Sequence, residues 1–224
     1  MIGVFDSGVG GYCAFREIRR LLPREDIVYL ADRKNAPYGT KSEDEIIAFT
    51  RANIKRLSSI GVEKILIACC TASSVYDALD EGEREISLPI ITPGAKMAAS
   101  GKKIAVIATE RTVKSRAFSR EIAKFSDSPV VEFPAQRLVS LVEGGCRDGR
   151  INRECETELN RIAGLVKESK ADRLVLGCTH FSHLESELGR RCEVKTVSPA
   201  REGATKLVKM IKNHRCESGR TIYI

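Results

Sequence analysis

Short apolar runs alternate with longer amphipathic segments along the whole chain. The runs are of strand length and lie at 2–5, 27–31, 64–68, 88–91, 103–108, 129–133, 172–177, 193–197 and 220–224. Two segments between them, 42–57 and 152–169, show helical spacing of apolar residues, and the first opens with a capping box of Ser42 and Glu45. Alternating strands and helices are typical of βαβ units. The sequence therefore predicts an α/β fold of mainly parallel sheets flanked by helices.

Two of the strand-like runs lead into nearly the same sequence. Residues 64–71 and 173–180 each contain an apolar run, a small residue, a cysteine and a threonine close behind. A buried parallel strand would put Cys69 and Cys178 at the sheet edge where α/β proteins bind ligands, beside a helix N-terminus that favours thiolate. A single cysteine there is more often a small core residue. The pair, however, suggests a reaction that needs a proton-transfer group on each face of one substrate.

A weaker repeat suggests two pseudo-symmetric domains, because residues 1–6 recur in outline at 103–108. We predict a first domain of residues 1–92 plus 199–224 and a second domain of residues 93–198. The site is expected in the cleft between them. If both thiols act on one carbon from opposite sides, their sulfur atoms should lie roughly 7–8 Å apart.

Composition narrows the class of protein. The 224 residues carry a net charge of +7, with 42% hydrophobic and 30% charged residues, which is ordinary for a soluble globular chain. No run approaches the roughly 18 apolar residues of a membrane span, and the N-terminus lacks the basic segment of a secretory signal. We expect a cytoplasmic protein with no membrane partner. The basic residues do not cluster and no tryptophan lies among them, which argues against nucleic acid as a partner.

The eight cysteines are scattered and include no Cys-x-x-Cys pair. Cytosolic thiols are normally kept reduced, so a disulfide is not expected. Adjacent residues such as Cys69 and Cys70 cannot readily supply two ligands to one tetrahedral metal ion. We therefore expect no metal site.

Polar loops follow the first two strands. The glycine-rich loop 6–11 can bring backbone N–H groups to a carboxylate or phosphate, although it lacks the spacing of a dinucleotide fingerprint. Its first residue, Asp6, could equally be a turn or cap residue. The loop 32–40 could be a plain surface turn or part of a binding site. Near the second cysteine, His180 can carry the proton of a neighbouring thiol.

Five segments resemble the glutamate racemase family, in that family's order: 5–11, 37–42, 68–73, 141–145 and 176–181. Together they span nearly the whole chain. The resemblance implies a cofactor-independent interconversion of L- and D-glutamate, with the D-isomer feeding peptidoglycan synthesis. In the family, one cysteine thiolate removes the α-proton while a second cysteine thiol protonates the opposite face. This agrees with the paired cysteines, because a thiol pKa of roughly 8.5 lets each serve as acid or base.

Matched position by position, the resemblance also implies roles for individual residues. Cys69 and Cys178 are the acid/base pair, with Asp6 assisting Cys69 and His180 assisting Cys178. Glu143 matches an acidic position and is an auxiliary candidate. The substrate-binding candidates are Ser7, Pro37, Tyr38, Gly39, Cys70, Thr71, Ser73, Thr112 and Thr179. No cofactor is implied, glutamate is the expected small-molecule partner, and a homodimer is one expected assembly.

The sequence departs from the family pattern at a few positions. Cys70 stands where asparagine is usual, so that a carboxamide is replaced by a poor hydrogen-bonding thiol. Phe181 and Ser182 stand where Tyr-Pro is usual. Two alternatives therefore stay open: a related amino-acid racemase, for example one acting on aspartate, and a non-catalytic amino-acid-binding relative.

Overall fold

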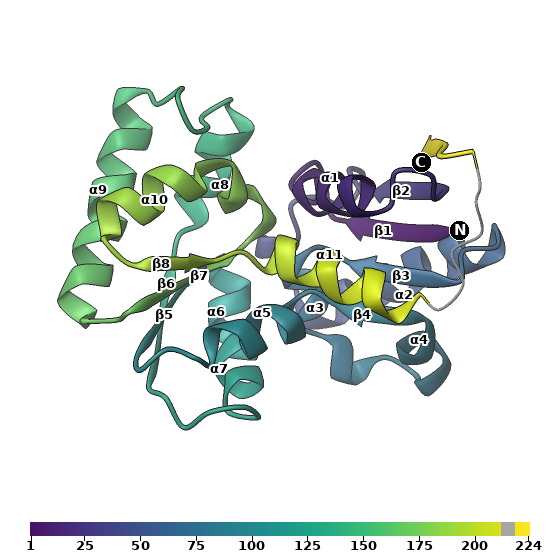
Figure 1. The fold of residues 1–224 in the computed structure, drawn as a ribbon, viewed down its shortest axis with the longest axis horizontal. Coiled ribbons are helices and arrows are strands. Elements are labelled where there is room, and N and C mark those ends of the chain that lie inside the picture. Colours follow the sequence, from purple (N-terminus) through teal and green to yellow (C-terminus); the bar gives the residue numbers. More distant parts are fainter. Residues whose placement is uncertain (212–217) are drawn as a thin grey trace. The chain divides into compact units, whose positions relative to one another are not determined.

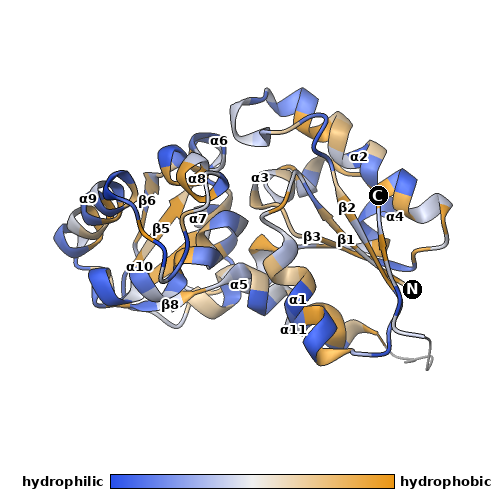
Figure 2. Ribbon diagram, turned by 90° about the horizontal axis from the view of Figure 1, so that it is seen from above, coloured by the Kyte–Doolittle hydropathy of each residue, from blue (hydrophilic) through white to orange (hydrophobic). Residues whose placement is uncertain are grey.

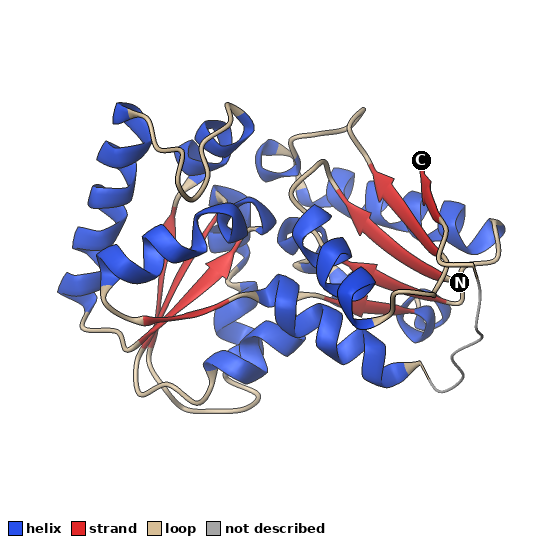
Figure 3. Ribbon diagram, turned by 45° about the horizontal axis from the view of Figure 1, so that its top comes forward, coloured by secondary structure: helices blue, strands red, loops and turns tan. Residues whose placement is uncertain are grey.

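The computed structural model describes residues 1–211 and 218–224, which form two compact units. Unit 1 comprises Met1–Ile90 and Ala200–Ile224, and unit 2 comprises Ile91–Pro199 (Figure 1). Each unit contains a parallel sheet flanked by helices (Figure 3), so the predicted α/β fold is confirmed. Among the described residues, no helix combines the length and apolar character needed to cross a membrane.

Unit 1 is built on a five-stranded sheet of order β4-β3-β1-β2-β9, in which every neighbouring pair is parallel. Its strands are β1 (Ile2–Asp6), β2 (Ile27–Ala31), β3 (Lys64–Ile67), β4 (Ser87–Pro89) and β9 (Thr221–Tyr223). Its helices and 3₁₀ turns (η) are α1 (Tyr12–Leu21), η1 (Tyr38–Thr40), α2 (Glu43–Ser59), α3 (Cys70–Ser73), η2 (Tyr76–Ala78), α4 (Glu81–Ile86) and, from Ala200 onward, α11 (Pro199–Met210).

Unit 2 contains a four-stranded parallel sheet of order β6-β5-β7-β8. Its strands are β5 (Ile104–Ala108), β6 (Val130–Pro134), β7 (Arg173–Gly177) and β8 (Lys195–Val197). Its helices are α5 (Ile91–Ala98), α6 (Glu110–Ser115), α7 (Ala117–Ile122), α8 (Gln136–Glu143), α9 (Arg153–Ser169), η3 (Thr179–Leu184) and α10 (Glu185–Cys192). Read from the other end, this order is β8-β7-β5-β6, which matches the order β4-β3-β1-β2 in unit 1. In this match β5 corresponds to β1, and β7 corresponds to β3.

The central strands form because both of their faces are covered. Every residue of β1 and of β5 is buried, as expected for parallel strands packed between two layers of helices. In Figure 2 the strands are mostly hydrophobic, whereas α9 carries both hydrophilic and hydrophobic residues, which is the pattern of a helix with one face on a core.

Local capping fixes where the longer helices begin. The predicted capping box is present at the start of α2: Ser42 Oγ accepts from the Glu45 N–H, and the Glu45 carboxylate accepts from the Ser42 N–H. The start of α9 has a simpler cap, in which Asn152 Oδ1 accepts from the Cys155 N–H at 2.8 Å.

Two predicted strand boundaries are wrong by two residues. The run 193–197 was expected to be a strand throughout, but Glu193 is the C-cap of α10 and β8 begins only at Lys195. The apolar run 88–91 was expected to be a strand throughout, but β4 ends at Pro89 and Ile91 is already the first residue of α5. A short apolar run has no periodicity that separates the end of a strand from the buried start of a helix.

Candidate active site

Three polar residues lie at the carboxyl edge of the unit 1 sheet. Asp6 is the last residue of β1, Asp32 follows β2, and Cys69 lies two residues after the last residue of β3. The strands are parallel and in register, with Asp6 opposite Ala31 and Phe5 opposite Ile67, so their carboxyl ends meet at one edge. This is the edge at which α/β sheets bind ligands.

Cys69 is the N-terminal cap of α3 and is 5% exposed. Its Sγ accepts a hydrogen bond from the Ala72 N–H at 3.5 Å and donates to Ser7 Oγ at 3.3 Å. Burial, reinforced by the negative charge of Asp6, raises the pKa of the Cys69 thiol to about 11, although hydrogen bonds that Ser7 and Ala72 can donate to the thiolate act in the opposite direction. Without a bound cation this group is therefore a thiol at neutral pH.

Asp6 is completely buried, and its Oδ2 accepts from the Gly8 N–H at 2.9 Å. The following turn can come this close only because residue 11 is glycine. A Cβ at Gly11 would lie 2.5 Å from Asp6 Cβ, which is closer than such atoms pack. The glycine-rich loop thus holds the Asp6 carboxylate beneath the turn that carries Ser7.

The 37–39 segment contributes less side-chain chemistry than expected. Pro37 is exposed and follows a cis peptide bond, and Gly39 is half-buried. The side chain of Tyr38 is buried, and its hydroxyl donates to Asp32 Oδ2 at 2.6 Å. What this segment offers a ligand is therefore its backbone N–H groups, because the first residues of a helical turn have no acceptor within it.

The remaining unit 1 candidates, Cys70, Thr71 and Ser73, all lie in α3 and are buried. The Ser73 hydroxyl donates to the Ile67 carbonyl at 2.9 Å and accepts from the Ile90 N–H at 3.0 Å. Ser73 thus ties α3 to the strand layer.

In unit 2 the corresponding edge carries Cys178. This residue follows β7, the neighbour of the central strand β5, and occupies the N-cap position of η3. It is 7% exposed, and its Sγ lies 3.6 Å from His180 Nδ1. The other ring nitrogen, Nε2, lies 3.4 Å from Glu143 Oε1, within ion-pair reach but without good hydrogen-bond geometry, so the attraction develops when the imidazole is protonated. Thiol, imidazole and carboxylate therefore form a chain.

Three threonines lie near this edge. Thr112 is fully buried in α6, and Thr109, the residue that follows β5, caps that helix and donates from Oγ1 to Thr112 Oγ1 at 2.9 Å. Thr179 is 5% exposed at the start of η3. The hydroxyls of these residues add polar groups to this edge beside the thiol and the imidazole.

The sequence marked the loop 32–40 as a possible part of a binding site but did not single out Asp32 or Asn35 within it, and Asn53 and Thr109 were missed. Asp32 and Thr109 each follow a strand directly, and this position could have marked them. Asn53 lies inside α2 and contacts Tyr38 and Asp32 only through the tertiary fold, so no local signal marks it.

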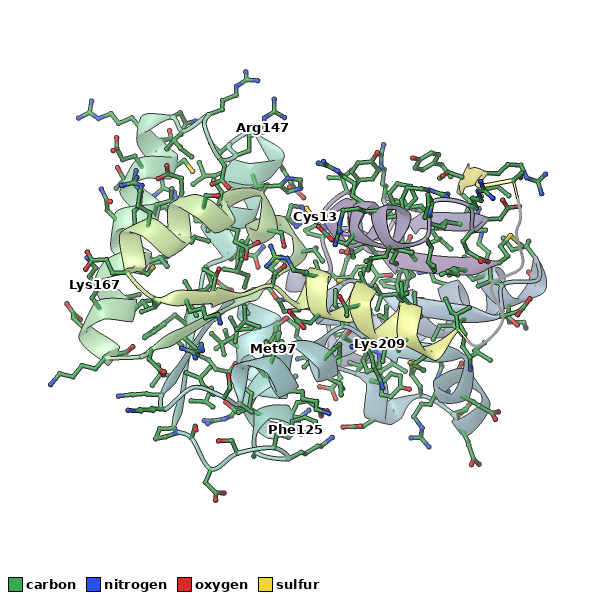
Figure 4. All side chains as sticks on the ribbon, in the orientation of Figure 1. Cys13, Met97, Phe125, Arg147, Lys167 and Lys209 are labelled. Carbon is green, nitrogen blue, oxygen red and sulfur yellow. The ribbon has the colours of Figure 1, made fainter. Side chains whose placement is uncertain are left out.

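The cysteines in the described ranges are not joined in disulfide bonds: Cys13, Cys69, Cys70, Cys146, Cys155, Cys178 and Cys192. Of these, Cys13 on α1, labelled in Figure 4, is the half-buried one and the rest are buried. Residues 1–211 and 218–224 contain no group of three or more His, Cys, Asp or Glu side chains placed to hold a metal ion.

Comparison with known proteins gives the class to which this arrangement belongs. The family model described as Asp/Glu/Hydantoin racemase matches residues 13–207. A glutamate racemase of Persephonella marina is 39% identical over 188 residues, 82% of this chain and 71% of that protein. One from Aquifex aeolicus is 36% identical over 220 residues, 95% of this chain and 84% of that protein.

A solved structure supports the same family. The glutamate racemase of Francisella tularensis in complex with D-glutamate superimposes with a TM-score of 0.89 at 29% identity, covering 99% of this chain and 85% of that chain. The chain therefore belongs to the Asp/Glu/Hydantoin racemase family. The relatives named here are all glutamate racemases, so the resemblance inferred from the sequence is confirmed.

Proposed function

We propose that this protein interconverts L- and D-glutamate without a cofactor, using Cys69 and Cys178 as the two proton-transfer groups. The observation that carries the proposal is the repeated placement of a buried cysteine at the carboxyl end of the strand beside the central strand, once in each unit. The family membership and the glutamate racemases at 36–39% identity support it.

Racemisation needs a base on one face of the α-carbon and an acid on the other. In the proposed reaction, a thiolate takes the α-proton, the electron pair stays on the α-carbon next to the carboxylate, and the thiol of the other cysteine delivers its proton to the opposite face. The first cysteine ends as thiol and the second as thiolate. The roles therefore exchange when the opposite enantiomer is the substrate.

The two thiols differ in how they reach the reactive state. Because burial and Asp6 raise the pKa of Cys69 to about 11, its thiolate is scarce but more basic than an ordinary one, which suits removal of a weakly acidic α-proton. The ammonium group of a bound amino acid would bring a positive charge that lowers this pKa. For Cys178, the imidazole of His180 can take the thiol proton, and Glu143 can stabilise the resulting imidazolium.

In this proposal the polar groups at the two edges bind the amino acid. The backbone of Tyr38 and Gly39 and the hydroxyls of Ser7, Thr71, Thr112 and Thr179 are assigned to its carboxylates and ammonium group. Donors fixed before the substrate arrives stabilise the charge that develops on the carbanion. The D-glutamate formed would serve peptidoglycan synthesis in the cytoplasm, where thiols stay reduced.

The test is a cofactor-free assay. Purified protein in the presence of a metal chelator should convert L-glutamate to D-glutamate, followed by circular dichroism. In D₂O it should incorporate deuterium at the α-carbon, because each turnover delivers a solvent-exchanged thiol proton. An amino-acid-binding relative would show binding but no exchange, and a racemase for aspartate would turn over aspartate in preference to glutamate.

A further inference from the structure

A hydrogen-bond network inside unit 1 joins three segments around the Asp32 carboxylate. The Tyr38 hydroxyl donates to Asp32 Oδ2 at 2.6 Å, and Nδ2 of Asn53 donates to the same oxygen at 3.0 Å. The same Nδ2 lies 3.2 Å from the Tyr38 hydroxyl oxygen, to which it also donates. Asn35 Nδ2 lies 3.0 Å from each Asp32 oxygen. One carboxylate thus takes hydrogen bonds from the loop after β2, from η1 and from α2.

The network holds these segments together and does not transfer protons. Burial raises the pKa of the Asp32 carboxyl, but the hydrogen bonds from Tyr38, Asn35 and Asn53 outweigh burial, so the pKa lies below its usual value. Burial, together with the bond to Asp32, raises the pKa of the Tyr38 hydroxyl. Near neutral pH, Asp32 is therefore an acceptor and Tyr38 a donor, and neither changes its protonation state.

Asn53 is an unusual residue for its position. It is 7% exposed in the interior of α2, where asparagine is a poor helix former and a buried amide is costly unless it is hydrogen-bonded. A carboxylate can only accept, so the amide nitrogen must be the atom that faces Asp32. Thr50, one turn earlier on the helix, is fully buried, and among the described residues no hydrogen-bond partner reaches its Oγ1. Burial on this side of α2 therefore does not by itself produce a contact with Asp32 and Tyr38.

The segment around Tyr38, which Asn53 contacts, is not stable in isolation. The turn η1 covers only Tyr38–Thr40, and a single 3₁₀ turn has little stability of its own. The Tyr38 ring packs against Phe5 and Phe49, with ring centroids 6.3 and 5.7 Å away. Ring packing places the side chain, and the hydroxyl bonds fix it against α2, a long helix with a capped N-terminus.

We propose that Asn53 is a positioning residue that fixes the backbone of Tyr38 and Gly39 for the amino-acid substrate. The inference rests on the proposed function, which assigns that backbone to substrate binding. Asn53 acts only through Tyr38 and Asp32, so its loss should weaken substrate binding and leave the chemistry of Cys69 and Cys178 nearly unchanged. The expected signature is a rise in KM with little change in kcat.

The decisive variant is Asn53→Asp, which keeps the size of the side chain and replaces the donor with an acceptor that faces Asp32. We expect KM for both glutamate enantiomers to rise by roughly tenfold, because two hydrogen bonds are lost and two carboxylates come together. Asn53→Ala, which removes the donor without adding a charge, should raise KM by roughly fivefold. Tyr38→Phe removes the hydroxyl alone and should raise KM by roughly threefold.

Thr50→Val is the matched control, because it changes a buried polar residue of the same helix that does not contact the network. It should alter the melting temperature but not KM. An unchanged KM in both Asn53→Asp and Tyr38→Phe, or a loss confined to kcat, would overturn the inference. If Asn53→Asp does not fold, Tyr38→Phe decides.

The control for the proposed function is the wild-type protein. If it does not racemise glutamate, the proposed function fails on its own, and the inference is then decided by calorimetric titration with D-glutamate. The same weakening of binding in Asn53→Asp supports the inference, and equal binding by wild type and variant refutes it.

Discussion

Cys69 and Cys178 follow equivalent strands of two sheets with the same strand order, yet the groups around them have opposite chemistry. The neighbours of Cys69 are the Asp6 carboxylate and the Ser7 hydroxyl. Cys178 lies beside the His180 imidazole, whose other nitrogen faces Glu143. At the place of Asp6, the central strand of unit 2 ends in Ala108, so the second thiol has no carboxylate at that position.

This difference shows how one strand-end position can favour either state of a thiol. A fixed anion disfavours a second negative charge beside it, whereas an imidazole can accept the proton and then attract the thiolate. The proposed reaction needs one thiol and one thiolate at the same time. The two neighbourhoods supply these roles differently, because the Asp6 carboxylate opposes ionisation of Cys69 and the His180 imidazole is a proton acceptor beside Cys178.

Replacement of either cysteine should have the largest effect. Cys69→Ser and Cys178→Ser should each lower kcat by roughly a thousandfold or more, because a serine hydroxyl is a poor base at neutral pH. The assay is glutamate racemisation followed by circular dichroism. Cys13→Ser, which changes the half-buried cysteine of α1, is the control and should retain activity. Comparable turnover in wild type, Cys69→Ser and Cys178→Ser would exclude the two-cysteine mechanism.

Replacement of Asp6 or His180 should show how the surroundings of Cys69 and Cys178 differ. Asp6→Asn and His180→Asn should each reduce kcat by about a hundredfold. Only Asp6→Asn should change the ionisation of Cys69. Its carboxylate helps to raise the pKa of that thiol to about 11, so removing the charge lowers the pKa and speeds alkylation of Cys69 by iodoacetamide at pH 8.

The measurement is the rate of Cys69 modification between pH 7 and 10, read by mass spectrometry. His180→Asn is the control that should leave this rate unchanged. A slower reaction of Cys69 in Asp6→Asn would contradict the assignment of the carboxylate as the group that opposes ionisation.

Gly177 and Ala68, which immediately precede the two cysteines, should respond differently when a methyl side chain is added or removed. A Cβ at Gly177 would lie 2.7 Å from the backbone oxygen of Ile107, which cannot move easily, whereas unit 1 has the buried Ala68 immediately before its cysteine. Gly177→Ala should therefore destabilise the protein by about 1–3 kcal/mol, seen as a lower melting temperature. Ala68→Gly should cost only about 0.5–1 kcal/mol. An equal loss in both variants would show that the two strand ends are packed alike.

Cys70→Asn should give the smallest effect. If the side chain of residue 70 reaches the substrate, the carboxamide adds one or two hydrogen bonds, and KM for glutamate should fall by roughly two- to tenfold. Cys70 is 3% exposed in α3, so an asparagine there must also fit a tight space. An unchanged or higher KM would mean that residue 70 packs in the core and that the assignment of substrate contact at this position is wrong.

The sequence by itself determined the features that depend on neighbours along the chain. The apolar runs gave the buried central strands, and the Ser42–Glu45 capping box and the Asn152 cap set the starts of α2 and α9, because these interactions span only a few residues. The ordered motifs were also enough to indicate the family that the comparisons confirm.

The tertiary structure decided which polar atoms remain available to contact a substrate. From the sequence, Tyr38 and Ser73 are polar residues in substrate-binding motifs, but the Tyr38 hydroxyl is bonded to Asp32 and the Ser73 hydroxyl bridges Ile67 and Ile90. The 3.4 Å approach of Glu143 to His180 likewise joins residues from separate helices. Hydrogen bonds and charge pairs between distant segments depend on how strands and helices pack, and no local pattern of residues encodes that packing.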